Sequence, residues 1–330
     1  MACRVGNFAK QMGLPVSYCS YDQHDTPGVW QEWDGEVVRG VRNFKRWATR
    51  CSHIIWFDVH RNRLAKAEGW GLHNTLVPLI HRVAHNSYKH LHLFDVIACP
   101  TNMTWKMLSN GGVDRAANMG WDPGLDFERK SGMFCENTKR LLVVPEPPLS
   151  DEEGLMLAYT LRALCDGDPS IEVTILQDRQ WPRSVNKAML HLASVHCCRV
   201  NILRKPSHAA LLYAYKVHDW VLYAATKISV GTRITEALAC GTPVITFNVP
   251  PVTEILTHGV NSELVSCNTY KGFLGLPSVE PNAKYLLKAL EQTVGNPIQW
   301  HLLNAESWQD GLQDAKERFE GFWKQCWCRC

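Results

Sequence analysis

The chain has no long hydrophobic run, and this argues against a protein that spans a membrane. Although 45% of its 330 residues are hydrophobic, no apolar stretch approaches the ~18–20 residues that a membrane span needs. The N-terminus also lacks a charged leader followed by an apolar block, so no secretion signal is expected. Internal repeats and low-complexity tracts are absent as well. Length and composition indicate a folded protein with two domains of ordinary size.

Cysteine is plentiful, but the spacing that a zinc site requires is missing. The chain has thirteen cysteines, and neither the pair Cys197-Cys198 nor the cysteines at 326–330 have a second pair at zinc-site spacing. Cys99, Cys165 and Cys240 fall inside apolar runs, where a reduced cysteine packs as a small hydrophobe. We therefore expect no metal site, reduced thiols and a cytoplasmic location.

Strands and helices alternate along the chain, a pattern typical of an α/β protein with parallel sheets. In the second half, strands are predicted at 140–145, 171–177, 199–204, 219–224, 243–247 and 263–266, and helices near 151–165, 184–195, 207–216, 232–239 and 252–257. In the first half, strands are predicted at 15–20, 53–58 and 94–99, and helices near 37–48, 74–86 and 102–109. A final helix is predicted at roughly 304–324.

This order of elements predicts two doubly wound, Rossmann-like domains. The first would span 1–130 and the second 131–303, and the segment 304–330 would be a C-terminal helix packing back across the domain interface. A short helix precedes the first predicted strand. The N-terminal domain is therefore expected to be reduced, without an obvious first strand, because that strand is missing, replaced or lost through a misplaced start codon.

The most informative segment of the chain runs from Gly231 to Ile245. It predicts a turn that begins at glycine, a short helix containing Glu236, a Gly-Thr-Pro break and a buried strand. A helix that begins at glycine leaves its first N–H groups unpaired and pointing outward, where they can bind an anion. Glu236 lies one turn further along, within reach of hydroxyls on the same ligand. A phosphate beside hydroxyls indicates a nucleotide sugar.

The segment Leu238–Ile245, which reads Leu-Ala-Cys-Gly-Thr-Pro-Val-Ile, is followed by Pro251–Leu256 and His258–Asn261. Together these segments resemble the retaining GT-B glycosyltransferases of family 4 (glycosyl transferases group 1). The resemblance implies two Rossmann-like domains facing a cleft. It also implies transfer of a sugar from a nucleotide-diphosphate donor, UDP- or GDP-linked, to an acceptor hydroxyl with retention of configuration. No separate cofactor and no divalent metal are implied, because helix dipoles and basic side chains stabilise the leaving diphosphate.

The resemblance also assigns roles to particular residues. Glu236 matches the glutamate that holds the ribose hydroxyls, although it could instead be a solvated helix residue. Gly231 and Thr232 match the helix start that receives the diphosphate. His60, just after the predicted strand 53–58, resembles the N-domain histidine that approaches the transferred sugar, a catalytic position.

The family pattern is broken at two places. Ile228 stands where the family has a second glutamate, and the segment 144–153 has no basic residue where the family has an arginine and a lysine. Positive charge for the diphosphate must then come from elsewhere. We favour Arg233 and Lys205 over Arg179 and Arg204, since both lie at strand-to-helix turns. These departures leave a second interpretation open, a non-catalytic GT-B-like module that binds a nucleotide sugar or a protein partner.

Basic residues gather in the first half, where the acceptor would bind, although the net charge of the chain is only +3. Between 39 and 66 the only acidic residue is Asp58, and the basic residues are Arg39, Arg42, Lys45, Arg46, Arg50, Arg61, Arg63 and Lys66. The predicted helix near 37–48 would carry several of them on one face. Three interpretations remain open. The face is simply solvated, or it lies on the anionic inner face of a membrane and gives access to a lipid-linked glycan, or it follows the phosphates of a nucleic acid with modified bases as acceptors.

Overall fold

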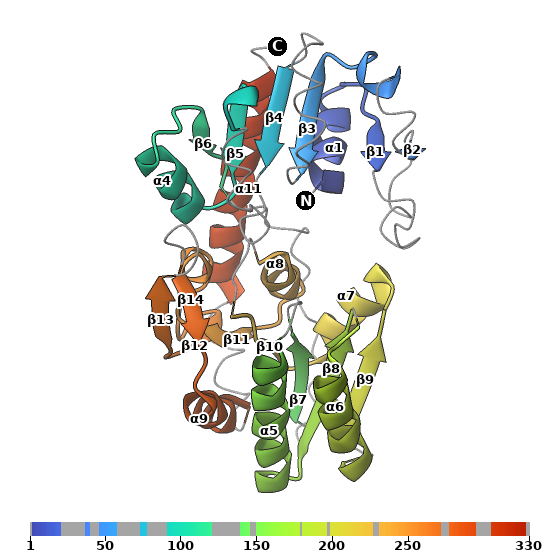
Figure 1. Ribbon diagram of the computed structural model, residues 1–330, viewed down its shortest axis with the longest axis vertical. Helices are drawn as coiled ribbons and strands as arrows, with labels where there is room; N and C mark the ends of the chain where they lie inside the picture. Colours follow the sequence, from blue (N-terminus) through green and yellow to red (C-terminus); the bar gives the residue numbers. More distant parts are fainter. Residues whose placement is uncertain are drawn as a thin grey trace. The chain divides into compact units, whose positions relative to one another are not determined.

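The structure is a computed structural model, shown in Figure 1. It describes residues 2–20, 37–39, 46–57, 73–77, 91–120, 139–145, 150–178, 180–196, 199–226, 231–271, 277–294 and 305–327. The chain forms two compact units. Unit 1 comprises Met1–Gly124 together with Asp314–Cys330, and unit 2 comprises Leu125–Gln313. The domain boundaries predicted at 130 and 303 fall in stretches outside the described residues, so they stay predictions.

Unit 2 is built on a six-stranded parallel sheet in the order β12-β11-β10-β7-β8-β9. This is the strand order of a doubly wound dinucleotide-binding domain, with the order reversing between β7 and β10. The strands are β7 (Lys139–Val144), β8 (Ile171–Gln177), β9 (Val200–Arg204), β10 (Trp220–Tyr223), β11 (Val244–Phe247) and β12 (Ser262–Val265).

Helices cover both faces of this sheet. They are α5 (Asp151–Gly167), α6 (Arg183–Val195), α7 (His208–Val217), α8 (Thr232–Ala239) and α9 (Ala283–Val294). Helix α5 contacts α6 and α9, whereas α7 contacts α8, and right-handed crossovers place these two groups on opposite faces. Figure 1 shows α5 and α6 in front of the strands. Burial on both faces explains why β10 and β11 are buried at every residue.

The elements predicted in the second half are present, with one change, and the structure contains further elements beside them. The helix predicted near 252–257 is only a 3₁₀ turn, η5 (Val252–Glu254). It ends there because the Thr257 N–H donates to the side chain of Asn261 (2.8 Å) instead of continuing a helix. The further elements are helix α9 and the antiparallel pair β13 (Asn268–Lys271) and β14 (Pro277–Glu280), none of which the sequence pattern predicts.

Unit 1 contains a four-stranded parallel sheet in the order β3-β4-β5-β6 and a separate parallel pair, β1-β2. The strands are β1 (Tyr18–Ser20), β2 (Val37–Arg39), β3 (His53–Phe57), β4 (His73–Val77), β5 (Val96–Cys99) and β6 (Ala116–Asn118). The helices are α1 (Ala2–Gln11), α4 (Asn102–Asn110) and α11 (Ala305–Trp327), the last of which extends into unit 1 from residue 314.

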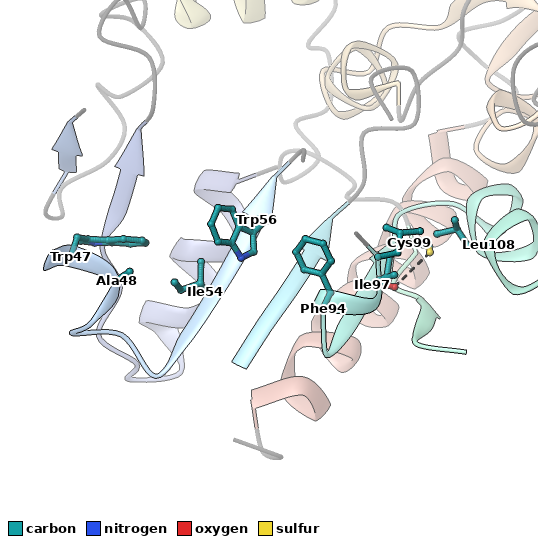
Figure 2. Packing of buried hydrophobic residues seen from close by; sticks show 9 residues of the cluster. Trp47, Ala48, Ile54, Trp56, Phe94, Ile97, Cys99 and Leu108 are labelled. Atoms are coloured by element: carbon teal, nitrogen blue, oxygen red, sulfur yellow. Dashed lines mark hydrogen bonds between the residues drawn. The ribbon is translucent and has the colours of Figure 1, made fainter. Parts of the chain in front are cut away.

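The sheet β3-β4-β5-β6 has a hydrophobic cluster on each face. Figure 2 shows the first cluster, formed by Trp47, Ala48, Ile54, Trp56, Leu91, Phe94, Ile97, Cys99 and Leu108. The second cluster is formed by Val5, Phe8, Val77, Ala98, Met119, Phe319 and Trp323. Successive residues of β5 alternate between the two clusters, as side chains of a strand must. The C-terminal helix therefore supplies part of the core of unit 1.

Of the helices predicted in unit 1, the one near 37–48 is wrong at its start but helical at its end, residues 46–48, and the one at 74–86 is wrong at the residues described. Val37–Arg39, predicted to begin the basic helix near 37–48, is strand β2, because its β-branched valines pair in parallel with Tyr18 and Cys19. Strand β4, His73–Val77, overlaps the first residues of the helix predicted at 74–86, and it pairs with β3 and β5. Residues 40–45 and 78–90 lie outside the described residues.

Candidate functional site

The candidate site lies at the carboxyl ends of the strands of unit 2, where open α/β sheets bind their ligands. Strand β8 ends at Gln177, β9 at Arg204 and β10 at Tyr223. Helices α7 and α8 begin in the segments that follow β9 and β10. Figure 1 shows α8 beyond the end of β10. Side chains from these segments meet around one carboxylate.

Helix α8 begins at Gly231, which has a left-handed conformation with φ 65° and ψ 37°. A glycine suits this conformation, and a β-carbon here would also lie 3.3 Å from Ile234 Cδ1. No side chain caps the helix start. The first intrahelical bonds run from the N–H groups of Ile234 and Thr235 to the Gly231 carbonyl. The N–H groups of Thr232 and Arg233 precede these bonds, so they are free of the helix ladder and suited to an anion.

Glu236, one turn into α8, is a paired carboxylate whose side chain is only 17% exposed. Its Oε2 accepts hydrogen bonds from the Tyr215 hydroxyl (3.3 Å) and from Arg233 Nη1 (3.3 Å). Its Oε1 lies 3.5 Å from His208 Nε2, at the first residue of α7. Glu236 is therefore anchored by three side chains and is not a solvated helix residue.

Arg233 contacts a second carboxylate with the other nitrogen of its guanidinium. Its Nη2 donates to Asp178 Oδ2 at 2.7 Å, and Asp178 directly follows β8. The Arg233 and Asp178 side chains are half-buried, at 30% and 28% exposed. The chain Asp178–Arg233–Glu236 thus connects the end of β8 to α8.

The electrostatics of this cluster keep Glu236 ionised. Burial alone would raise its pKa, but the hydrogen bond from His208 and the positive charge of Arg233 outweigh burial and lower the pKa. For Tyr215, burial and the neighbouring Glu236 charge raise the pKa well above its ordinary value. The phenol therefore remains a hydrogen-bond donor to a charged carboxylate.

Lys205 has a different environment from Arg233. It follows β9 with φ 41°, a left-handed conformation that is uncommon for a residue with a side chain. Its backbone N–H donates to the Gln177 carbonyl at 2.9 Å, which ties the end of β9 to the end of β8. Its side chain is exposed and makes no ion pair with any residue that the structure describes. Lys205 is thus available to a ligand at this edge.

The acidic start of α5 has a structural role. Ser150 and Glu153 form a capping box, in which each side chain accepts from the other's backbone N–H. The second oxygen of Glu153 accepts from the Thr226 hydroxyl, after β10. Acidic residues also favour the positive end of a helix. The acidic residues at 151–153 stand in the segment where the resembled family has an arginine and a lysine. Here they stabilise the start of α5.

The site residues predicted from the sequence have different outcomes. Glu236, Gly231, Thr232 and Arg233 lie together on α8, and Lys205 lies at the same edge of the sheet. His60, Ile228 and Arg179 lie outside the described residues. Sequence reasoning missed Asp178, His208 and Tyr215. The first two follow predicted strands at this edge, a signal that could have found them, whereas Tyr215 is one of many apolar residues of α7.

Two negative findings apply to the described part of the chain. Within it, no group of three or more His, Cys, Asp or Glu side chains could hold a metal ion. None of its helices is long and apolar enough to cross a membrane. Its cysteines include Cys99, Cys165 and Cys240, which are buried free thiols.

Comparison with known proteins gives one family match and several structural neighbours. Residues 199–275 match the family described as Glycosyl transferases group 1. This stretch includes Lys205, His208, Tyr215 and all of α8, whereas Asp178 lies before it. No curated protein sequence matches the chain.

Among solved structures, the chain is similar to sucrose-phosphate synthase from Thermosynechococcus elongatus, with a TM-score of 0.67 and 13% identity over 99% of this chain and 92% of that one. It is similar to a glycosyltransferase from Rickettsia africae, with a TM-score of 0.65 and 13% identity over 96% and 88% of the two chains. It is also similar to Anabaena Alr3699/HepE, solved with UDP and glucose, with a TM-score of 0.64 and 13% identity over 96% and 98%. At such identities the likeness is one of fold. The chain has the fold of GT-B glycosyltransferases, and its residues 199–275 match the group 1 family.

Proposed function

We propose that the protein is a glycosyltransferase that takes a sugar from a nucleotide-diphosphate donor, UDP- or GDP-linked, and transfers it to an acceptor hydroxyl with retention of configuration. The observation that carries this proposal is Glu236, an ionised and largely buried carboxylate one turn from an uncapped helix start. A carboxylate beside an anion site matches the vicinal hydroxyls and diphosphate of a nucleotide. The group 1 segment at 199–275 supports the same ligand class.

The donor would bind through three features of this edge. The diphosphate would accept hydrogen bonds from the N–H groups at the start of α8, and Lys205 would add positive charge. The ribose hydroxyls would donate to Glu236 Oε1, because Oε2 already accepts from Tyr215 and Arg233. Of these groups, Glu236 is ionised and can therefore accept from both ribose hydroxyls.

The reaction would need no metal at this site. The departing diphosphate would be stabilised by the start of α8 and by Lys205 as the glycosidic bond breaks. The acceptor hydroxyl would attack on the face that the diphosphate leaves, and the diphosphate would take its proton. His60, outside the described residues, would hydrogen-bond the sugar from unit 1.

The acceptor is proposed as a class with three members, a free glycan, a lipid-linked glycan or a modified nucleic-acid base. The basic residues between 39 and 66 support an anionic partner such as a membrane surface or a nucleic acid. Because 37–39 form a strand, any peripheral membrane contact would involve a basic surface and not one continuous helix. The free buried cysteines support a reducing, cytoplasmic location.

Ile228 favours a second candidate, a non-catalytic GT-B-like module, because the glutamate expected there contacts the donor sugar in the resembled family. Such a module would bind a nucleotide sugar, or only a protein partner, without transfer. Binding and turnover therefore have to be measured separately.

The test combines calorimetric titration of UDP and GDP with slow hydrolysis of a panel of radiolabelled UDP- and GDP-sugars. Glu236→Ala should weaken binding of the preferred nucleotide by on the order of 1.5–3 kcal/mol, since it removes hydrogen bonds to a charged acceptor. Glu291→Ala, an exposed glutamate on α9, is the matched control and should leave affinity unchanged. Binding without hydrolysis would support the non-catalytic module. The absence of both binding and hydrolysis with every donor would overturn the nucleotide site.

A further inference from the structure

Arg233 is a basic side chain in the first turn of α8, yet it is already paired with two carboxylates. Nη2 lies 2.7 Å from Asp178 Oδ2 and Nη1 lies 3.3 Å from Glu236 Oε2. Both partners are carboxylates, and all three side chains are at least two-thirds buried. A diphosphate that recruited Arg233 would compete with two carboxylates for one positive charge, and drawing the guanidinium away would weaken both ion pairs.

We propose that Arg233, anchored by Asp178, is a positioning residue that orients Glu236 toward the ribose and is not a ligand of the diphosphate. This inference rests on the proposed nucleotide site and makes it more specific. It assigns ribose recognition to the chain Asp178–Arg233–Glu236 and phosphate recognition to Lys205 with the start of α8. Asp178 then contributes to binding through its ion pair with Arg233.

The two carboxylate oxygens of Glu236 have different hydrogen-bond partners. Oε2 accepts from two donors, Arg233 Nη1 and the Tyr215 hydroxyl, which come from α8 and α7. These two donors fix the plane of the carboxylate. Among the described residues, Oε1 has one partner, the half-buried His208 at 3.5 Å, where Oε2 has two. Oε1 is therefore the oxygen left to accept from a diol.

The planar guanidinium of Arg233 suits this role better than a lysine would. Arg233 uses two nitrogens on the same fork to reach one carboxylate just after β8 and one on α8, and the rigid fork relates the position of one to that of the other. A lysine at 233 would keep the charge but could not hold both groups in one plane. Lys205, with its exposed side chain, has the mobility to follow a phosphate.

Two affinity ratios distinguish ribose recognition from phosphate recognition. The affinity of UDP divided by that of 2′,3′-dideoxy-UDP reports the contribution of the ribose hydroxyls. The affinity of UDP divided by that of uridine reports the contribution of the phosphates. If the protein prefers GDP, the guanosine compounds replace those of uridine. Both ratios are measured by calorimetric titration for the wild-type protein and each variant.

The variants to compare are Asp178→Asn, Arg233→Gln, Arg233→Lys and Lys205→Ala. We expect the first three to lower the ribose ratio by about tenfold and to leave the phosphate ratio unchanged. Lys205→Ala should lower the phosphate ratio and leave the ribose ratio unchanged. The control is a second Arg–Asp pair, Arg162 and Asp166 on α5, where Arg162→Gln and Asp166→Asn should change neither ratio. Circular dichroism checks that each variant is folded, and Arg233→Lys retains the buried charge if Arg233→Gln does not fold.

Each outcome decides between the alternatives. If the UDP/uridine affinity ratio falls below the wild-type value in both Arg233 variants while the UDP/dideoxy-UDP ratio is unchanged, Arg233 is a diphosphate ligand and the inference is overturned. Unchanged ratios in Asp178→Asn would overturn the part assigned to Asp178. If the wild-type protein binds UDP or GDP and the Arg233 variants have both ratios unchanged, only the inference is overturned and the proposed nucleotide site stands. A wild-type protein that binds no nucleotide overturns the proposed function itself.

Discussion

Gly154 of α5 packs directly against Val185 of α6, so that a β-carbon on Gly154 would lie 2.6 Å from Val185 Cγ1 and would also clash with Cγ2. Glycine inside a helix costs about 1 kcal/mol relative to alanine, so this close approach explains its presence. We predict that Gly154→Ala lowers the free energy of unfolding by about 1–3 kcal/mol, because overpacking outweighs helix propensity. Urea unfolding followed by circular dichroism measures the change.

The same contact predicts a non-additive double variant. In Gly154→Ala with Val185→Ala, the new methyl occupies space that the valine vacates, so the double variant should be more stable than the sum of the single effects. Gly167→Ala is the control on the same helix. No atom lies within 4 Å of its β-carbon position, and this change should stabilise by about 0.4–1 kcal/mol. Additive effects of Gly154→Ala and Val185→Ala would contradict the packing argument.

Asp168, after the end of α5, predicts a dependence of stability on pH. Hydrogen bonds from Lys139 Nζ (2.7 Å) and from the Ser170 hydroxyl (2.6 Å) and N–H lower its pKa from 3.8 to about 2. A depressed pKa in the folded state stabilises the fold above the ordinary pKa. This contribution is therefore complete above about pH 4 and is lost as the pH falls toward about 2.

Asp168→Asn should accordingly cost about 1 kcal/mol at pH 7, a discounted figure because the side chain is a third exposed. Urea unfolding at several pH values between 7 and 3 should show the difference from wild type shrinking as the pH falls. Asp166→Asn, with a more exposed carboxylate that lies 3.7 Å from Arg162, is the control and should have a smaller effect. A difference that is constant with pH would contradict the assignment to Asp168.

Trp323 predicts that the C-terminal helix is needed by unit 1. It is fully buried beside Phe319 and Phe322 of α11, and it belongs to the same cluster as Phe8 and Val77. Trp323→Ala should cost about 3–5 kcal/mol of unfolding free energy. Lys324→Ala, the exposed neighbour, should have a small effect. Thermal unfolding followed by circular dichroism compares the two, and equal effects would place α11 outside the core.

Unit 2 could be predicted from the sequence because its signals are local. Strand β7 contains the buried apolar run Leu141–Val144, and every residue of β11 (Val244–Phe247) is buried. Turn residues separate both strands from the helices. In unit 1 the strand Val37–Arg39 lies within a stretch of helical apolar spacing, and the strand His73–Val77 overlaps another. Their pairing partners are distant in the chain, and only the folded sheet decides between strand and helix.

The candidate site was predictable in part for the same reason. Gly231 and Glu236 belong to one contiguous motif, and the spacing of Arg233 and Glu236 at i and i+3 was a visible sign that they pair. Asp178 and His208 reach this pair only because β8, β9 and β10 lie in one sheet. From the sequence alone, a basic residue near a helix start therefore predicts a phosphate ligand, because the local motif does not contain the acidic partner Asp178.

Gly231 gives the last prediction, because its conformation and its contact can be separated. Its φ of 65° costs an alanine about 1–2 kcal/mol, and the added β-carbon would also press on Ile234 Cδ1. Gly259 has a similar φ of 77° with no atom near its β-carbon position, so Gly259→Ala measures the conformational cost alone. Gly231→Ala should be the more destabilising of the two in urea unfolding, and Gly231→Asn should recover part of the loss, since asparagine tolerates the left-handed region better. Equal effects of the two alanine variants would mean that Ile234 moves aside without cost.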